Sequence, residues 1–238
     1  MKTTLLTIQL FSVISAVVAF TASPATAVIN GDFETGDFTG WTVSGIGGLG
    51  DPIDPSSFIS VTEVAGNKVA RFKTGEFADG LFVATLEQTL SVNASEPILS
   101  FDLTLPTVLP DPTGTGSSPF VDGLFVSLDD GTDFFELLLV DQFGIVADPF
   151  GTAPGSVALG SPTDPNFDFN FSADLSSLAG ENLRLFIDLI QEDDGFLFDP
   201  DIDNVLLRGA AEPIPEPVTA MLGTSSLIAL GLAVRRRR

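Results

Sequence analysis

The chain has 238 residues and a formal net charge of −22, from 32 acidic and 10 basic residues. It contains no Cys, His or Tyr. Catalytic triads that use His, Cys nucleophiles and His or Cys metal sites are therefore excluded, and any catalysis would depend on carboxylates. A surface this acidic repels nucleic acid and attracts cations.

The N-terminus has the features of a signal peptide. Lys2 precedes an apolar stretch from Leu5 to Phe20, and the small residues Ala25-Thr26-Ala27 follow. This order predicts a signal peptide over residues 1–27 that signal peptidase removes after Ala27. We therefore expect an exported protein whose body, residues 28–211, is one domain that folds without disulfides.

The body alternates apolar and polar residues, and turn clusters of Gly, Pro and Asp separate the runs. Period two predicts half-buried strands. The expected strands are Phe58–Val64, Lys68–Lys73, Gly80–Val92, Ile98–Leu105, Leu124–Leu128, Phe134–Val140, Phe167–Ser172, Leu183–Ile190 and Ile202–Leu207. Many short strands without helical crossovers predict an all-β fold, an antiparallel β-sandwich.

Particular segments of the body carry more specific expectations. In Leu183–Ile190, four aliphatic residues should face inward, with Arg184 and Asp188 on the other face beside Phe186 and Ile190. Asp174–Gly180 suggests one helical turn that Asp174 caps. We interpret most of the phenylalanines as core residues. Two low-complexity stretches, Leu109–Pro119 and Asp148–Pro165, are predicted to be surface loops.

Two motifs at opposite ends of the body carry a resemblance. "NGDFETGDFTGW" (Asn30–Trp41) resembles the opening of galactose-binding-like jelly-roll domains, a fold shared by many carbohydrate-binding modules, and "DIDNVLL" (Asp201–Leu207) resembles their closing strand. The resemblance implies a jelly roll whose first and last strands lie close together. Trp41, within the opening motif, is expected to pack in the interior.

The same resemblance implies a structural calcium ion. Glu34 and Asp203 occupy the positions that the acidic ligands of the family would take. Calcium needs six to eight oxygens, so backbone carbonyls and another loop would have to contribute. The alternative is that both side chains are solvated acids in turns.

The C-terminus resembles the PEP-CTERM sorting signal of Gram-negative bacteria. Pro215, Glu216 and Pro217 form the motif, Val218–Val234 is an apolar run, and Arg235, Arg236, Arg237 and Arg238 form the basic end. The apolar run is long enough for one transmembrane helix, and the arginines would stay on the cytoplasmic side. The resemblance implies that residues 212–238 are a transient anchor processed by an exosortase. An ordinary single-pass anchor is the alternative.

These features predict a protein sorted to the cell envelope, cell surface or extracellular matrix. We expect a non-catalytic structural or adhesive role there, with exopolysaccharide as a partner and no binding to nucleic acid. A carbohydrate-binding module is the alternative, and a carboxylate-based glycosidase is the third hypothesis.

Overall fold

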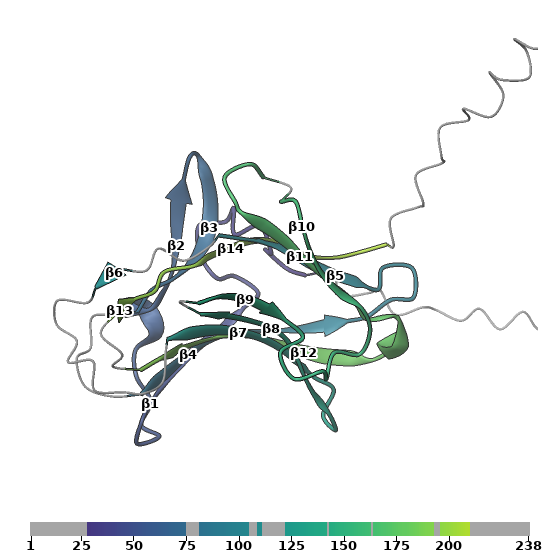
Figure 1. Ribbon diagram of the computed structural model, residues 1–238, viewed down its shortest axis with the longest axis horizontal. Helices are drawn as coiled ribbons and strands as arrows, with labels where there is room; N and C mark the ends of the chain where they lie inside the picture. The colour runs from purple at the N-terminus through teal and green to yellow at the C-terminus, as the bar shows by residue number, and fades with distance from the viewer. Residues whose placement is uncertain are drawn as a thin grey trace, which may run out of the picture.

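The computed structural model describes residues 28–74, 81–104, 109–110, 122–141, 143–162, 164–192 and 196–209. Within these residues two six-stranded antiparallel sheets pack face to face (Figure 1). The predicted signal peptide, the PEP motif, the apolar run and the arginines lie outside the described residues. No helix in the described part of the chain is long and apolar enough to span a membrane.

The first sheet, sheet A, has the strand order β1-β4-β12-β7-β8-β9. Its strands are β1 (Thr42–Gly47), β4 (Phe82–Ser91), β12 (Asn182–Gln191), β7 (Gly123–Asp129), β8 (Phe134–Asp141) and β9 (Gly144–Ala147). The second, sheet B, has the order β10-β11-β5-β14-β3-β2. Its strands are β10 (Val157–Gly160), β11 (Phe169–Asp174), β5 (Ile98–Leu103), β14 (Asp201–Arg208), β3 (Asn67–Phe72) and β2 (Ile59–Val64).

The minor elements are a two-stranded ribbon and two single-turn helices. β6 (Leu109–Pro110) pairs with β13 (Phe196–Leu197), and the 3₁₀ turns are η1 (Pro55–Ser57) and η2 (Ser176–Leu178). The chain crosses between the two sheets repeatedly, at the connections β1–β2, β3–β4, β4–β5, β5–β7, β9–β10, β11–β12 and β12–β14. The predicted antiparallel β-sandwich is thus confirmed, and these crossings between sheets are consistent with a jelly roll.

Each predicted strand is present, with shifted ends, but the sequence did not predict β1, β6, β9, β10 or β13. β6 lies within Leu109–Pro119, which was expected to be a loop, and the rest of that stretch lies outside the described residues. β10 lies within Asp148–Pro165, which was expected to be a loop, so that prediction was wrong for Val157–Gly160. Only Val157 of β10 is partly buried, and the next three residues are exposed. β10 is an edge strand that pairs through its backbone with β11. Such pairing does not need alternating apolar side chains, so the sequence carries no signal for this strand.

The predicted helical turn is present as η2, but its cap differs from the expectation. Leu175 occupies the N-cap position and makes no side-chain cap bond. Asp174, one residue earlier, accepts hydrogen bonds from the Ser176 amide at 2.9 Å and from its hydroxyl. These bonds lower the pKa of Asp174. Asp174 therefore stabilises the turn from outside the cap position.

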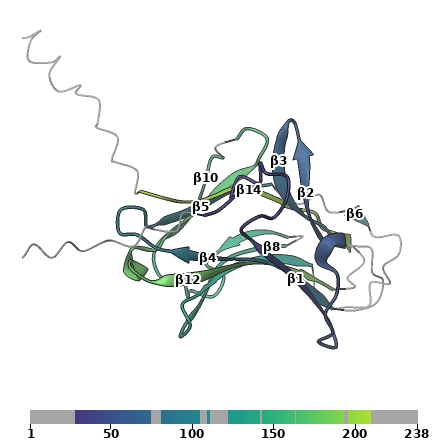
Figure 2. The ribbon, with the colours of Figure 1, turned by 180° about the vertical axis from the view of Figure 1, so that it is seen from behind.

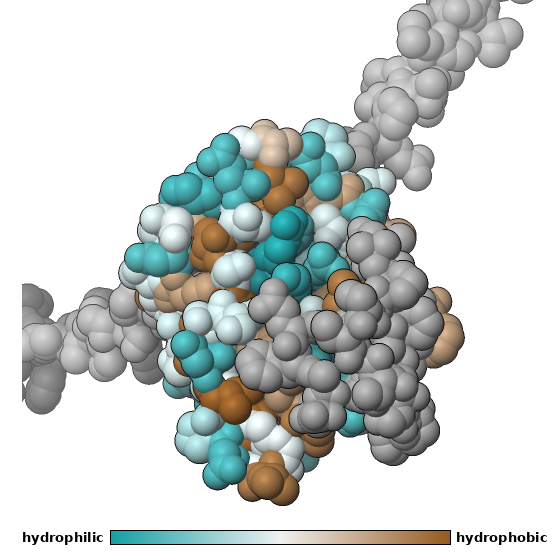
Figure 3. Space-filling view, turned by 90° about the vertical axis from the view of Figure 1, so that its left-hand side faces the viewer, coloured by the Kyte–Doolittle hydropathy of each residue, from teal (hydrophilic) through white to brown (hydrophobic). Residues whose placement is uncertain are grey.

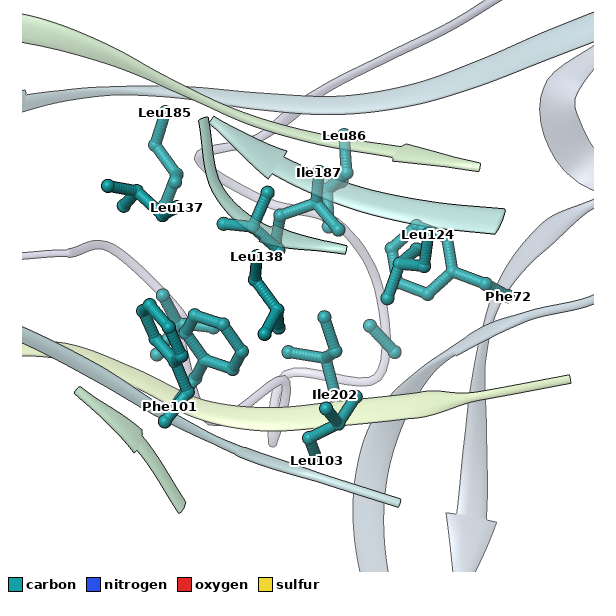
Figure 4. Packing of buried hydrophobic residues seen from close by; sticks show 14 of the residues in the cluster. Phe72, Leu86, Phe101, Leu103, Leu124, Leu137, Leu138, Leu185, Ile187 and Ile202 are labelled. Carbon is teal, nitrogen blue, oxygen red and sulfur yellow. The ribbon is translucent and has the colours of Figure 1, made fainter. Parts of the chain in front are cut away.

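The core fills the space between the two sheets (Figure 4). Leu185 and Ile187 point from β12 toward Phe101, Leu103 and Ile202 of sheet B, and all five are fully buried. The inward face predicted for Leu183–Ile190 is confirmed, because the four aliphatic residues at alternate positions are fully buried. This packed interface is the main source of stability in a chain without disulfides.

The opening motif lies against the closing strand, as the resemblance implied. The Val205 amide of β14 donates a hydrogen bond of 2.9 Å to the Gly31 carbonyl. A Cβ atom at Gly31 would lie 1.9 Å from the Val205 carbonyl oxygen, so only glycine fits there. Trp41 is 8% exposed, packs against Phe33, and donates from Nε1 to the Asn30 carbonyl at 3.2 Å. Its predicted packing role is confirmed.

Sheet A is arched, and the concave side of the arch faces away from sheet B (Figures 1 and 2). At the end of the sandwich shown in Figure 3, the described residues mix hydrophobic with hydrophilic side chains and form no single large apolar patch.

Candidate functional site: a hollow on the concave face of sheet A

The strand period determines which side chains β12 and its neighbours present on the concave face. Because its aliphatic residues point into the core, β12 turns Arg184, Phe186, Asp188 and Ile190 outward. Cross-strand pairing sets Thr85 of β4 on one side of Asp188 and Phe125 of β7 on the other. In the same way, Phe186 lies between Glu87 and Ser127.

A β-bulge in β8 adds an aromatic ring and a carboxylate to this face. Leu138 pairs with inward-facing Val126, but Glu136 pairs with outward-facing Ser127, so Leu137 is the extra residue. Leu137 and Leu138 are both fully buried. Without the bulge, strict alternation from Leu138 would turn Phe134 and Glu136 into the core. The bulge thus places Phe134 and Glu136 on the concave face.

These side chains surround a hollow with a volume of about 160 Å³. Its lining residues are Val83, Phe125, Ser127, Phe134, Glu136, Asp188 and Ile190. The lining combines two aromatic rings and two aliphatic side chains with three polar groups. Its volume is below the roughly 300 to 1,000 Å³ typical of pockets for drug-sized ligands. The hollow would therefore hold one small unit of a larger molecule lying along the face.

The polar groups of the hollow have spare hydrogen-bonding capacity. Asp188 accepts a bond of 2.5 Å from the Thr85 hydroxyl through Oδ1. The Ser127 hydroxyl is buried, with the residue 1% exposed, and has no hydrogen-bond partner in the described structure. Oε2 of Glu136 is also buried without a partner among the described residues. Buried polar groups without partners are uncommon, and a water molecule or a ligand group that enters the hollow can supply the missing bond.

Burial changes the acid–base properties of both carboxylates. Removal from solvent raises the pKa of Glu136. It also raises the pKa of Asp188, where the Thr85 hydrogen bond opposes the effect and the charge of Glu87 adds to it. In both cases the charged form has lost water without gaining a cation.

An arginine lies on the same face but is already engaged. The Arg184 guanidinium forms an ion pair with Asp129 and lies over the Phe186 ring, with its Cζ atom 5.1 Å from the ring centroid. Bonds from the Gly131 amide and from Arg184 lower the pKa of Asp129. Phe134 stands 6.4 Å from Phe186, centroid to centroid. Arg184 is thus held by Asp129 and the Phe186 ring.

Sequence reasoning identified this site only in part. It predicted the outward face of β12, including Arg184 and Asp188, but it assigned most phenylalanines to the core. Three phenylalanines of the described part are exceptions, because Phe134 is 51% exposed, Phe143 81% and Phe150 64%. The position of Phe134 depends on the bulge, which the sequence of β8 does not reveal.

The two predicted calcium ligands lie in different environments. Glu34 is exposed; its Oε1 accepts from the Lys68 amide at 3.1 Å, and its carbonyl accepts from Lys68 Nζ at 2.9 Å. Asp203 is 1% exposed, and the acids whose charges act on it are Asp32 and Asp102. Among the described residues, no three acidic side chains are grouped closely enough to hold a metal ion.

Asp203 nevertheless belongs to a buried network of acids and amides on the outer side of sheet B. Its Oδ2 accepts from Asn67 Nδ2 at 2.6 Å, while its Oδ1 is buried and lacks a partner in the described structure. Burial raises the pKa of Asp203 to about 6. Neighbouring Asp102 accepts bonds from the side-chain amides of Asn170 and Asn204. Asp203 therefore offers one oxygen to a calcium ion, and the metal site stays a prediction.

Comparisons with known proteins add a likeness of overall fold. No protein-family model and no curated protein matches the chain. The solved structures that it resembles include the carbohydrate-binding module TmCBM61 in complex with β-1,4-galactotriose, at 16% identity and a TM-score of 0.43, covering 75% of this chain and 95% of that one.

A second similar structure is a carbohydrate-binding module of the β-sandwich superfamily, at 15% identity and a TM-score of 0.40, covering 73% of this chain and 59% of that one. A third is the enzymatically active domain of a bacteriophage tailspike protein, at 15% identity and a TM-score of 0.38, covering 77% of this chain and 21% of that one. At such identities and scores, we infer nothing from these structures about what this chain binds.

Proposed function

We propose that the protein binds a glycan on the concave face of sheet A and does not cleave it. The observation that carries the proposal is the hollow in which Phe125 and Phe134 lie beside buried Ser127, Glu136 and Asp188. A sugar ring has apolar C–H faces that pack on aromatic rings, and its hydroxyl groups can bond to carboxylates and hydroxyls. Sheet A is arched with its concave side away from sheet B (Figure 2), and an extended glycan chain would lie along that side.

A glycan array followed by calorimetry with one bound oligosaccharide tests the proposal. Phe134→Ala should weaken binding at least about tenfold, because an exposed aromatic anchor supplies much of the contact area. Phe143→Ala is the matched control, since Phe143 is also exposed but lies in the turn between β8 and β9. Equal affinity of the two variants would place the binding site elsewhere. Absence of binding to every glycan would overturn the proposal.

We also propose that the protein is exported and sorted to the cell surface or matrix, where glycan binding gives it an adhesive role. The sequence features Ala25-Thr26-Ala27, Pro215-Glu216-Pro217 and the four terminal arginines support this proposal. Intact-mass analysis from the native host should give a chain that begins at Val28 and lacks Arg235 to Arg238. A full-length C-terminus in a host with an active exosortase would contradict the sorting step.

A further inference from the structure

The concave face of sheet A carries an excess of negative charge. Strand register places the acids Glu87, Asp129, Glu136, Asp141 and Asp188 on this face. Among the described residues, the basic side chain on this face is that of Arg184. Its guanidinium is already paired with Asp129. The hollow itself is lined by two carboxylates and no basic side chain. Its uncompensated charge is therefore negative.

We propose that the hollow takes an amino-sugar unit, a hexose with a free, protonated amine, as part of a polysaccharide. This inference rests on the proposed glycan-binding function and names the class of glycan. It is carried by the position of Glu136 and Asp188 at one hollow together with the buried, unpartnered Ser127 hydroxyl.

An ammonium group matches the hydrogen-bonding deficit of the hollow. It has three donors and no acceptor, whereas the hollow offers the free Oε2 of Glu136, the Asp188 carboxylate and the Ser127 oxygen. Charge-assisted bonds of this kind are stronger than neutral ones. The rings of Phe125 and Phe134 line the same space, and aromatic faces attract a desolvated cation as well as the apolar face of a sugar.

The same features disfavour two other classes of ligand. No three acids among the described residues are grouped to hold a metal ion, so the carboxylates of the hollow are not arranged to bind sugar through calcium. An anionic polysaccharide, sulfated or rich in uronic acid, would have to approach a face with an excess of carboxylates in a protein of formal charge −22. Repulsion between like charges opposes that approach.

The decisive measurement compares two oligosaccharides that differ only at nitrogen. A β-1,4-linked glucosamine tetramer and its fully N-acetylated form have the same backbone, but only the first carries amines. By calorimetry at about pH 6.5 and moderate salt, we expect the amine form to bind about tenfold tighter or more. Glu136→Gln and Asp188→Asn should each reduce that preference. Because burial raises the pKa of both acids, the neutral replacements should leave the fold intact, which thermal melting checks.

Glu63→Gln is the matched control, because it removes one carboxylate from β2 of the opposite sheet. If it reduces the preference as much as Glu136→Gln does, general charge attraction explains the result and the proposal is overturned. If the N-acetylated tetramer binds equally well and Phe134→Ala abolishes its binding, the amino-sugar inference fails while the glycan-binding function stands. If no glycan binds in the hollow, both fail.

Discussion

Thr85 and Asp188 are directly opposite each other on β4 and β12, and the Thr85 hydroxyl donates a hydrogen bond of 2.5 Å to Asp188 Oδ1. The bond fixes one carboxylate oxygen and orients the side chain, which lines the hollow. It also partly offsets the loss of water that raises the pKa of Asp188. Thr85 is thus a positioning residue for the candidate site.

Replacing Thr85 by Val should raise the pKa of Asp188 further, because the charged form loses its hydrogen-bond donor. The change should also cost about 1 kcal/mol of unfolding free energy at neutral pH. A ¹³C NMR titration of the Asp188 carboxyl group, assigned with Asp188→Asn, measures the shift. Thr89→Val, on the same face of β4, is the control. An unchanged Asp188 titration would mean that the Thr85 bond does not act on its charge.

Because the pKa of Asp203 is raised, we expect the free energy of unfolding to depend on pH. Burial is the main cause of its pKa of about 6, while Asn67 and Asn204 oppose the shift and the charges of Asp32 and Asp102 add to it. The folded state therefore binds this proton more tightly than the unfolded chain, whose Asp pKa is about 3.9. As pH falls from about 6 to about 4, the free energy of unfolding should rise by at most about 3 kcal/mol from this group.

Asp203→Asn isolates that contribution. Without calcium, the variant should be more stable than the parent protein at pH 7, because it buries an amide instead of a charge. Its advantage should shrink as pH falls through about 6, when the parent Asp203 becomes protonated. Chemical denaturation at several pH values gives the two curves. Parallel curves would mean that Asp203 does not titrate in this window.

Calcium addition tests the predicted metal site at Glu34 and Asp203. If the ion binds the native state alone, it should add about 2.7 kcal/mol at 100 times its dissociation constant, or roughly 2 to 4 °C per kcal/mol in melting temperature. The effect should be selective for calcium over magnesium and largely absent from Asp203→Asn. If magnesium gives the same shift, charge screening accounts for it and the predicted ligands are ordinary acids.

Gly31→Ala tests the contact between the opening motif and the closing strand. The new Cβ atom would lie 1.9 Å from the Val205 carbonyl oxygen, so one of the two backbones must move. We expect a loss of about 1 to 3 kcal/mol or more, measured by denaturant unfolding. Gly160→Ala is the control, because a Cβ atom there meets nothing closer than 3.9 Å. Equal stability of the two variants would show that the contact yields without cost.

The sequence by itself determined the class of fold and much of one strand's chemistry. Period-two alternation depends only on neighbouring residues, so it predicted β12, its buried leucines and the outward position of Asp188. The resemblance of Asn30–Trp41 to the opening of jelly-roll domains implied a contact with the closing strand, and the bond between Val205 and Gly31 makes that contact. These are local patterns that a single segment carries.

Only the tertiary structure decided where the candidate site lies. The outward position of Phe134 and Glu136 depends on a bulge that β8 makes against β7, and β8 read alone does not contain that information. The edge strands β1, β9 and β10 form through backbone pairing with neighbours and need little apolar alternation. The hollow joins side chains from β4, β7, β8 and β12. Its chemistry arises from cross-strand register, because register brings residues distant in sequence to one face.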